Sequence, residues 1–142
     1  MYIRKLSLGD ENNDVRTPAR WALGQIGPKV IPALREALKV SNPRIRSGAA
    51  FALGSLGPAA EDTVPALVQT MKDQDRTVRI DAILAIGKTR ATSPAVVQAL
   101  IQVLEKDEDE VVRLDAARVL NKMETPEAKE AVIRYNKKNS PQ

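Results

Sequence analysis

One phrase occurs four times along this chain, and the repetition constrains the fold more than any other feature. The four copies read DVRTPARWALGQIG, RIRSGAAFALGSLG, TVRIDAILAIGKTR and VVRLDAARVLNKME. Each carries an Arg after a β-branched residue, and these arginines are Arg16, Arg46, Arg79 and Arg113, at periods of 30, 33 and 34 residues. Self-similarity at such a period is typical of a solenoid, in which stacked repeats bury a continuous core.

Each repeat resolves into a pair of helices. In the second repeat, the apolar residues recur at the spacing of one helical stripe, and they are Ile45, Ala49, Ala52, Leu53 and Leu56. Gly57 and Pro58 end this helix, since Gly tolerates a left-handed cap and Pro cannot continue the hydrogen bonding. The second helix reads TVPALVQTM, with Thr63 as its expected N-cap. The buried stripe of the second helices recurs every 33 residues at Leu34, Leu67 and Leu100.

Small residues recur at one register of the first helices. Gly24, Gly54 and Gly87 hold equivalent positions in three of the copies. Gly inside a helix costs roughly 1 kcal/mol relative to Ala. We therefore expect that these glycines let a neighbouring helix approach closely.

The periodicity predicts an all-α protein, a right-handed α-solenoid of stacked antiparallel helix pairs with four full repeats behind an N-terminal half-repeat. Residues 1–142 are expected to form one domain. Its parts are a half-repeat cap (1–9), repeat 1 (10–38), repeat 2 (39–71), repeat 3 (72–104), repeat 4 (105–136) and a polar tail (137–142). The flank of a terminal repeat would offer a surface for stacking on another copy of the chain.

Composition narrows the function. The 142 residues include no Cys and no His, which removes thiolate chemistry and the commonest metal ligand and general base. The acidic run EKDEDE, Glu105 to Glu110, lacks the Gly and the ligand spacing of a calcium loop, so we expect a solvated loop. No apolar run approaches the ~20 residues that span a bilayer, and the N-terminal MYIRKLSLGDENN has no apolar signal segment. We expect a cytoplasmic protein that is not an enzyme and holds no cofactor or metal.

Two phrases carry a family resemblance. VRTPARWALGQIGPKVIPALREAL and IRSGAAFALGSLGPAAEDTVPALVQTMKD closely resemble HEAT-like repeats of the phycobilisome-lyase type, and the resemblance covers about Asp10 to Tyr135. The resemblance implies an armadillo-like superhelix whose second helices line the concave face. Recurring Arg and Asp residues join adjacent units in that family, and we predict a ladder here with the pairs Arg46–Asp81 and Arg79–Asp115.

A non-catalytic interaction or scaffold module, holding a protein or peptide on the concave face, is the leading functional hypothesis. The candidate contact residues neighbour the buried leucines of the second helices, and they are Arg35, Glu36, Lys39, Val68, Gln69, Lys72, Ile101, Gln102 and Glu105. Val68 and Ile101 are apolar where solvent is expected. They either contact a partner or fill gaps within the stack, and the sequence leaves both interpretations open.

Two alternatives accompany this hypothesis. The net charge of +4 and the pI of about 9.5 favour nucleic acid as a partner, bound in a basic groove through Arg35, Lys39 and Lys72. The chain has no Lys/Arg-rich run and no nucleic-acid motif, so this interpretation ranks second. The second alternative, an accessory subunit related to bilin lyases, follows from the family resemblance alone.

Overall fold

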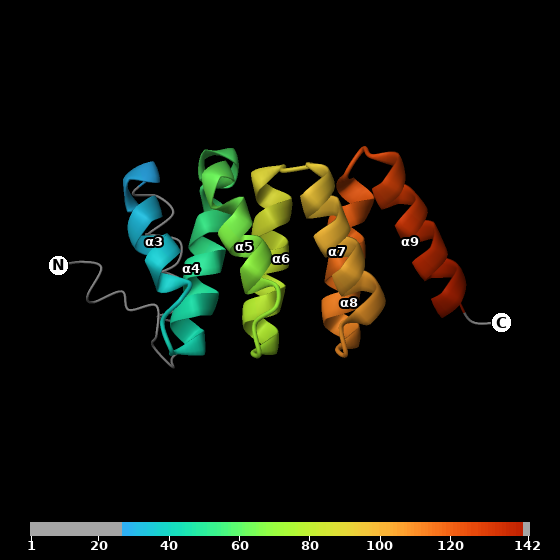
Figure 1. The fold of residues 1–142 in the computed structure, drawn as a ribbon, viewed down its shortest axis with the longest axis horizontal. Coiled ribbons are helices and arrows are strands. Elements are labelled where there is room, and N and C mark those ends of the chain that lie inside the picture. Colours follow the sequence, from blue (N-terminus) through green and yellow to red (C-terminus); the bar gives the residue numbers. More distant parts are fainter. Residues whose placement is uncertain (1–26, 141–142) are drawn as a thin grey trace. The chain divides into compact units, whose positions relative to one another are not determined.

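The computed structural model describes residues 27–140, and every regular element among them is helical (Figure 1). The predicted fold class, an α-solenoid built from helix pairs, is confirmed. The described residues form two compact units, residues 27–90 (unit 1) and residues 91–140 (unit 2). The predicted half-repeat 1–9 and the first helix of repeat 1, with Arg16 and Gly24, lie outside the described residues.

The helices alternate with short turns. In unit 1 they are η1 (Pro28–Val30), α3 (Ile31–Ala37), α4 (Pro43–Ser55), η2 (Gly57–Thr63), α5 (Val64–Thr70) and α6 (Arg76–Thr89). In unit 2 they are α7 (Pro94–Lys106), α8 (Glu110–Lys122) and α9 (Pro126–Asn139). The first helices of the repeats are thus α4, α6 and α8, and the second helices are α3, α5, α7 and α9.

Side-chain caps begin most of these helices. Asn42, Asp75 and Asp109 accept backbone N–H groups at the starts of α4, α6 and α8. Ser93 and Thr125 do the same for α7 and α9, and each is followed by a Pro in the first turn.

Thr63 holds the N-cap position of α5, as predicted, but its side chain makes no capping hydrogen bond. Thr63 is fully buried, and its hydroxyl donates to the carbonyl oxygen of Ala60 at 2.6 Å. The hydroxyl is satisfied within η2 because a 3₁₀ helix, rather than an extended residue, leads into α5. Gly57 has a φ of +61° and ends α4 as predicted.

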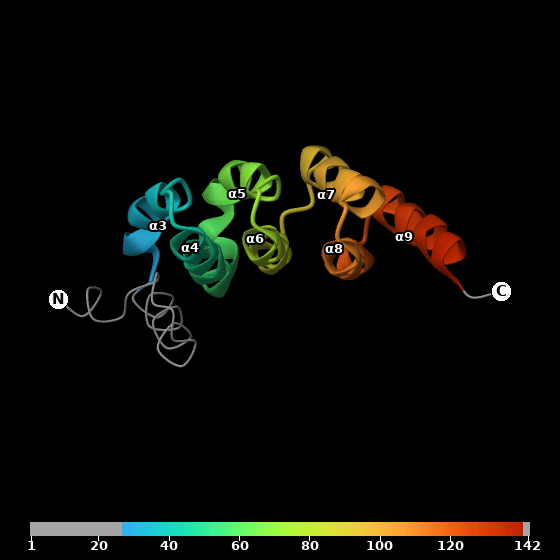
Figure 2. The same cartoon turned by 90° about the horizontal axis from the view of Figure 1, so that it is seen from below.

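Each unit has two layers (Figure 2). In unit 1, α3 and α5 form one layer and α4 and α6 the other. Helix α6 packs on both α4 and α5, and α3 packs on α4. In unit 2, α7 and α9 form one layer over α8, and all three pairs are in contact. The large side chains buried between the layers are Leu53, Leu67, Ile83 and Ile86 in unit 1, and Val112, Leu100 and Leu120 in unit 2.

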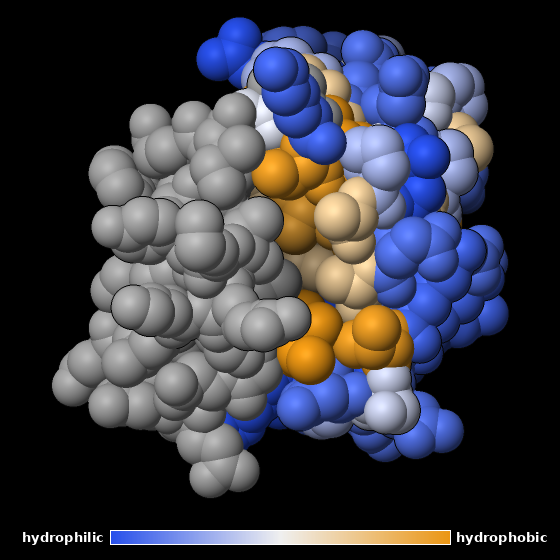
Figure 3. Space-filling model, turned by 90° about the vertical axis from the view of Figure 1, so that its left-hand side faces the viewer, coloured by the Kyte–Doolittle hydropathy of each residue, from blue (hydrophilic) through white to orange (hydrophobic). Residues whose placement is uncertain are grey.

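The end of unit 1 at α3 and α4 has a distinctive surface (Figure 3). Apolar residues form a band there, bordered by hydrophilic residues. Ile31 on α3 and Ile45 on α4 are half-buried. The half-repeat predicted to cover repeat 1 stays a prediction, because residues 1–9 are not among the described residues.

The close approach expected at Gly54 is confirmed. A Cβ built on Gly54 would lie 2.9 Å from the Cα of Ala85 on α6 and 3.2 Å from its Cβ. Real side chains do not tolerate the shorter of these separations against backbone, so α4 and α6 would have to move apart. The glycine therefore sets the spacing between the first helices of repeats 2 and 3.

We predict that Gly54→Ala lowers the free energy of unfolding, although Ala is the better helix former by about 1 kcal/mol. The lost contact between α4 and α6 is expected to outweigh that gain by about 1–3 kcal/mol. Urea unfolding monitored by circular dichroism measures the change. Ser55→Ala, at the adjacent exposed position, is the control and should leave stability within about 0.5 kcal/mol. Equal stability of the two variants would contradict the spacing role of Gly54.

Candidate interaction surface

Six of the predicted contact residues lie in unit 1, on the second helices α3 and α5 or in the turns that follow them. The stripe of these helices is buried at Leu34 and Leu67, as expected. Beside these leucines, Glu36, Lys39, Gln69 and Lys72 are exposed, and Arg35 and Val68 are half-buried. The layer of α3 and α5 thus presents polar and mainly basic side chains over a closed apolar core.

The other three predicted contact residues lie on α7 in unit 2. Gln102 and Glu105 are exposed, whereas Ile101 is only 7% exposed and belongs to the core. Of the two interpretations of Ile101, the structure supports gap filling within the helix stack. A single face that runs through all nine residues stays a prediction.

In repeats 2 and 3 the recurring arginine folds back over the turn that precedes its helix. Nη1 of Arg46 donates to the carbonyl oxygens of Val40 and Ser41, at 2.9 and 2.8 Å. Arg79 repeats the arrangement with Asp73 and Gln74, at 3.0 and 3.1 Å. In each case the acceptors lie six and five residues before the arginine. The side chain therefore fixes the turn that joins a second helix to the next first helix.

Unit 2 repeats this arrangement around Arg113, whose Nη1 donates to the Asp107 carbonyl oxygen at 2.5 Å. Two residues of the acidic run accept hydrogen bonds from backbone N–H groups in the turn itself and at the start of α8. The Asp107 carboxylate accepts the N–H of Asp109 at 2.9 Å, and Asp109 caps α8. This part of the run therefore shapes a turn.

An exposed Lys directly precedes each of these turns. Lys39, Lys72 and Lys106 each lie seven residues before the recurring arginine, so they share one register. The predicted set contains Lys39 and Lys72 and misses Lys106. The same 33- and 34-residue spacing would have found it.

Arg46 also joins two repeats of unit 1. Its Nε and Nη2 donate to the two carboxylate oxygens of Asp73, at 2.7 and 3.0 Å, a bidentate geometry. The side chains are 18% and 12% exposed, so water screens the pair only in part. The observed partner is thus Asp73 and not the predicted Asp81, because Arg46 folds back toward the turns at its end of the helices instead of extending along α6.

Asp81 has a different role in unit 1. It is buried on α6 and accepts a hydrogen bond from the hydroxyl of Ser47, which is buried on α4. This bond links the same two helices that meet at Gly54. The second predicted pair, Arg79–Asp115, would join unit 1 to unit 2 and stays a prediction.

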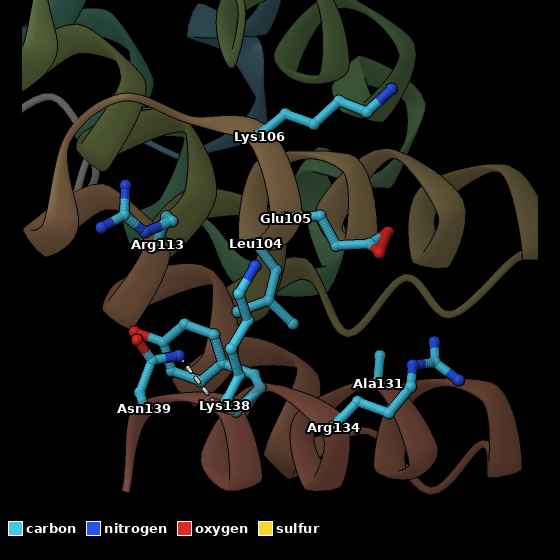
Figure 4. Close-up of a pocket in the computed structure, with 9 residues that line it drawn as sticks. Leu104, Glu105, Lys106, Arg113, Ala131, Arg134, Lys138 and Asn139 are labelled. Carbon is cyan, nitrogen blue, oxygen red and sulfur yellow. Dashed lines mark hydrogen bonds between the residues drawn. The ribbon is translucent and has the colours of Figure 1, made fainter. Parts of the chain in front are cut away.

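Unit 2 contains a hollow of about 570 Å³ at the end of the α7, α8 and α9 bundle (Figure 4). Leu104, Ala131 and Tyr135 contribute its less polar lining. The charged and amide residues around them are Glu105, Lys106, Arg113, Arg134, Lys138 and Asn139. In the view of Figure 4, Lys138 extends from α9 toward Leu104 on α7. The Asn139 amide donates to the Tyr135 carbonyl oxygen at 2.8 Å.

The sequence of α9 explains why this space is open. The buried stripe of α7 continues through Leu104 in its last turn. On α9 the buried residues, Ala128, Ala131 and Val132, all lie in the first half of the helix. The same face continues with the half-buried Tyr135 and then the exposed Lys138. On this face, the second half of α9 has the ring of Tyr135 but no aliphatic side chain, and space is left against α7 and α8.

The hollow has a strong excess of positive charge. Lys106, Arg113, Arg134 and Lys138 line it, with Glu105 as the single carboxylate among the lining residues. Among residues 27–140, no ion pair involves Arg134 or Lys138. These cations are therefore available to a ligand.

The described residues offer no metal site of the usual kind. No group of three or more acidic side chains in residues 27–140 is arranged to hold an ion, and the whole chain lacks His and Cys. Within the same range, no helix is both long and apolar enough to cross a membrane.

The architecture, antiparallel helix pairs repeated at a period of 33 to 34 residues, defines an α-helical repeat protein. Models of the family described as HEAT repeats match residues 3–87, 31–121 and 64–141. The chain belongs to the HEAT-repeat family. The phycobilisome-lyase subtype is a finer assignment and is taken up below.

Among solved structures, the chain is similar to the crystal structure of an engineered protein. The TM-score is 0.59 at 20% sequence identity, over 94% of this chain and 66% of the engineered one. The chain thus spans just under two thirds of that structure, and at this identity the likeness concerns the fold alone. No curated protein matches this sequence.

The Arg46–Asp73 pair predicts a pH dependence of stability. Burial raises the pKa of Asp73, but the hydrogen bonds from Arg46 and from the Asp75 N–H, with the charges of Arg46 and Arg79, bring this pKa below its usual value. A folded-state pKa below the unfolded one (~3.9) stabilises the fold above the unfolded pKa, and this contribution is lost as the pH falls through the folded pKa.

We predict that Asp73→Asn lowers the free energy of unfolding at neutral pH by about 1–3 kcal/mol. The difference from the native chain should shrink as the pH falls below the unfolded pKa (~3.9) and on through the lower folded pKa, because the native Asp73 carboxylate then becomes protonated and loses its charge. Urea unfolding at several pH values measures both quantities. Asp62→Asn, at an exposed position of η2, is the control and should be nearly neutral. A constant difference at all pH values would contradict the ion pair.

The burial of Ile101 gives a second prediction. Ile101→Asp places a carboxylate in the core of unit 2 and should lower the free energy of unfolding by about 3 kcal/mol or more. Val68→Asp, at a half-buried position of α5, should cost clearly less. Thermal unfolding by circular dichroism compares the two, and equal losses would contradict the assignment of Ile101 alone to the core.

Proposed function

We propose that this chain is a non-catalytic, cytoplasmic interaction module that binds a segment of a partner protein along the exposed positions of its second helices. HEAT repeats generally act as protein-interaction scaffolds, and solenoids of this type are typically non-enzymatic. The observation that carries the proposal is the recurring exposed lysine beside each arginine-fixed turn, at Lys39, Lys72 and Lys106. Rigid turns that present one charge type suit repeated contacts with an extended partner.

The charge of this surface indicates the chemistry of the partner. In unit 1, Arg35, Lys39 and Lys72 face solvent wholly or in part, and Glu36 is the acidic residue among the predicted contacts there. Complementarity then favours a partner segment that carries carboxylates. Val68, half-buried on α5, offers an apolar contact beside these charges.

Nucleic acid is the second candidate, and the same basic side chains favour it. The net charge is only +4 and the sequence has no arginine- or lysine-rich run, and both features argue against nucleic acid. The narrower family assignment, to the phycobilisome-lyase type with a bilin-related accessory role, rests on the sequence resemblance alone. We keep it as a hypothesis that the identity of a captured partner would test.

The test is capture of partners from a native lysate by the purified chain, with and without nuclease, followed by mass spectrometry and by binding of the purified partner. We expect nuclease-resistant capture that Lys39→Gln with Lys72→Gln weakens by about tenfold. Lys88→Gln with Arg90→Gln, at the C-terminal end of α6, is a control with the same charge change and should bind normally. Capture that disappears with nuclease would overturn the proposal in favour of nucleic acid.

A further inference from the structure

We infer that the hollow of unit 2 is a second binding site, which takes an acidic peptide segment with an apolar centre. The inference rests on the proposed function, because it names a class of partner for an interaction module. The hollow is formed by α7, α8 and α9 within unit 2 alone, and it shares only Glu105 and Lys106 with the surface of the proposed function. It is therefore independent of how the predicted contact residues of the two units are arranged.

The lining of the hollow defines the apolar part of the ligand. Leu104 and Ala131 are buried residues of the core that form part of its wall, and Tyr135 is half-buried beside them. A volume of about 570 Å³ lies in the range of ligand pockets, which is about 300–1,000 Å³. An aliphatic or aromatic side chain placed there would pack against the half-buried ring of Tyr135 and would fill space that α9 leaves open.

The cations that line the hollow define the polar part of the ligand. Lys106 lies on α7 and Arg113 on α8. Arg134 and Lys138 lie on α9, so positive charge reaches the hollow from all three helices. Arg113 uses Nη1 on the Asp107 carbonyl oxygen, which fixes its position while other N–H groups of the guanidinium remain for a ligand. Arg134 and Lys138 have no ion-pair partner within residues 27–140. Carboxylates on both sides of an apolar residue match this arrangement.

An acidic peptide fits the hollow better than a nucleic-acid backbone. A phosphate chain gains affinity from a continuous track of cations and leaves an apolar recess unused. Here the cations surround a recess with Leu104, Ala131 and Tyr135 in its wall, which an apolar side chain of a peptide can occupy. Glu105 on the same rim would accept a backbone N–H of the bound segment.

The probe is a fluorescein-labelled peptide of sequence Asp-Glu-Asp-Leu-Phe-Glu-Asp-Glu, titrated with the full chain and followed by fluorescence anisotropy. We expect saturable binding that weakens as salt is added. The peptide in which every acid is replaced by its amide, and the peptide with Gly-Gly in place of Leu-Phe, should each bind at least about tenfold more weakly. If the amide peptide binds as tightly as the acidic peptide, the proposed role of the cations is overturned. If the Gly-Gly peptide binds as tightly, the proposed role of the apolar recess is overturned.

Matched variants locate the site. Arg134→Gln with Lys138→Gln should weaken binding of the acidic peptide by about tenfold or more, with an unchanged circular dichroism spectrum. Lys122→Gln with Lys137→Gln removes the same charge from α8 and α9 at positions that do not line the hollow, and it should change binding less than about threefold. Equal loss in both pairs would mean non-specific charge attraction and would overturn the proposal.

Two further outcomes separate this inference from its alternatives. A mixed-sequence single-stranded oligonucleotide that displaces the peptide at lower concentration, and depends on Arg134 and Lys138, would assign the hollow to nucleic acid instead. Failure of the acidic peptide to bind, with partner capture still sensitive to Lys39 and Lys72, would reject the hollow and leave the proposed function standing. Peptide binding at the hollow without nuclease-resistant capture of a partner would support the hollow as a binding site and would reject the proposed function.

Discussion

Close contact between successive first helices is the constraint on which the structure of unit 1 depends. The backbone of α4 at Gly54 lies so near Ala85 of α6 that a single added methyl group has no room. The buried Ala49, Ala52 and Ala82 keep this layer equally thin. Short side chains bury little apolar area each, and stability must therefore come from the alignment of many small contacts. Polar contacts that fix the register of the helices therefore contribute a larger share of the stability here than they would in a protein with a deep aromatic core.

The recurring arginine provides such a contact and also shapes the surface. Because it bonds carbonyl oxygens five and six residues earlier, it fixes the turn after each second helix. Lys39, Lys72 and Lys106 immediately precede these turns, and each is exposed. The residue that stabilises the repeat therefore also sets where a basic side chain meets solvent. Under the proposed function, the recurring arginine would therefore also position the lysines that contact a partner.

The sequence predicted the parts of the fold that depend on local spacing. The helix pairs, the left-handed cap at Gly57 and the close approach at Gly54 all follow from periodicity and residue size. Prediction from the sequence failed where a side chain could reach more than one partner. Arg46 can extend along its helix or fold back, and only the three-dimensional position of the next turn selects Asp73. The hollow was not predicted either, since it depends on how α9 lies against α7 and α8.

The charged residues of α9 fall into two groups. Lys129, Glu130 and Lys137 are exposed and do not line the hollow. Arg134 and Lys138 instead line the side toward α7 and α8, where α7 itself carries Leu104. Solubility does not require cations there, and packing would favour an apolar residue. Charge placed at the expense of packing is typical of a surface that contacts a ligand.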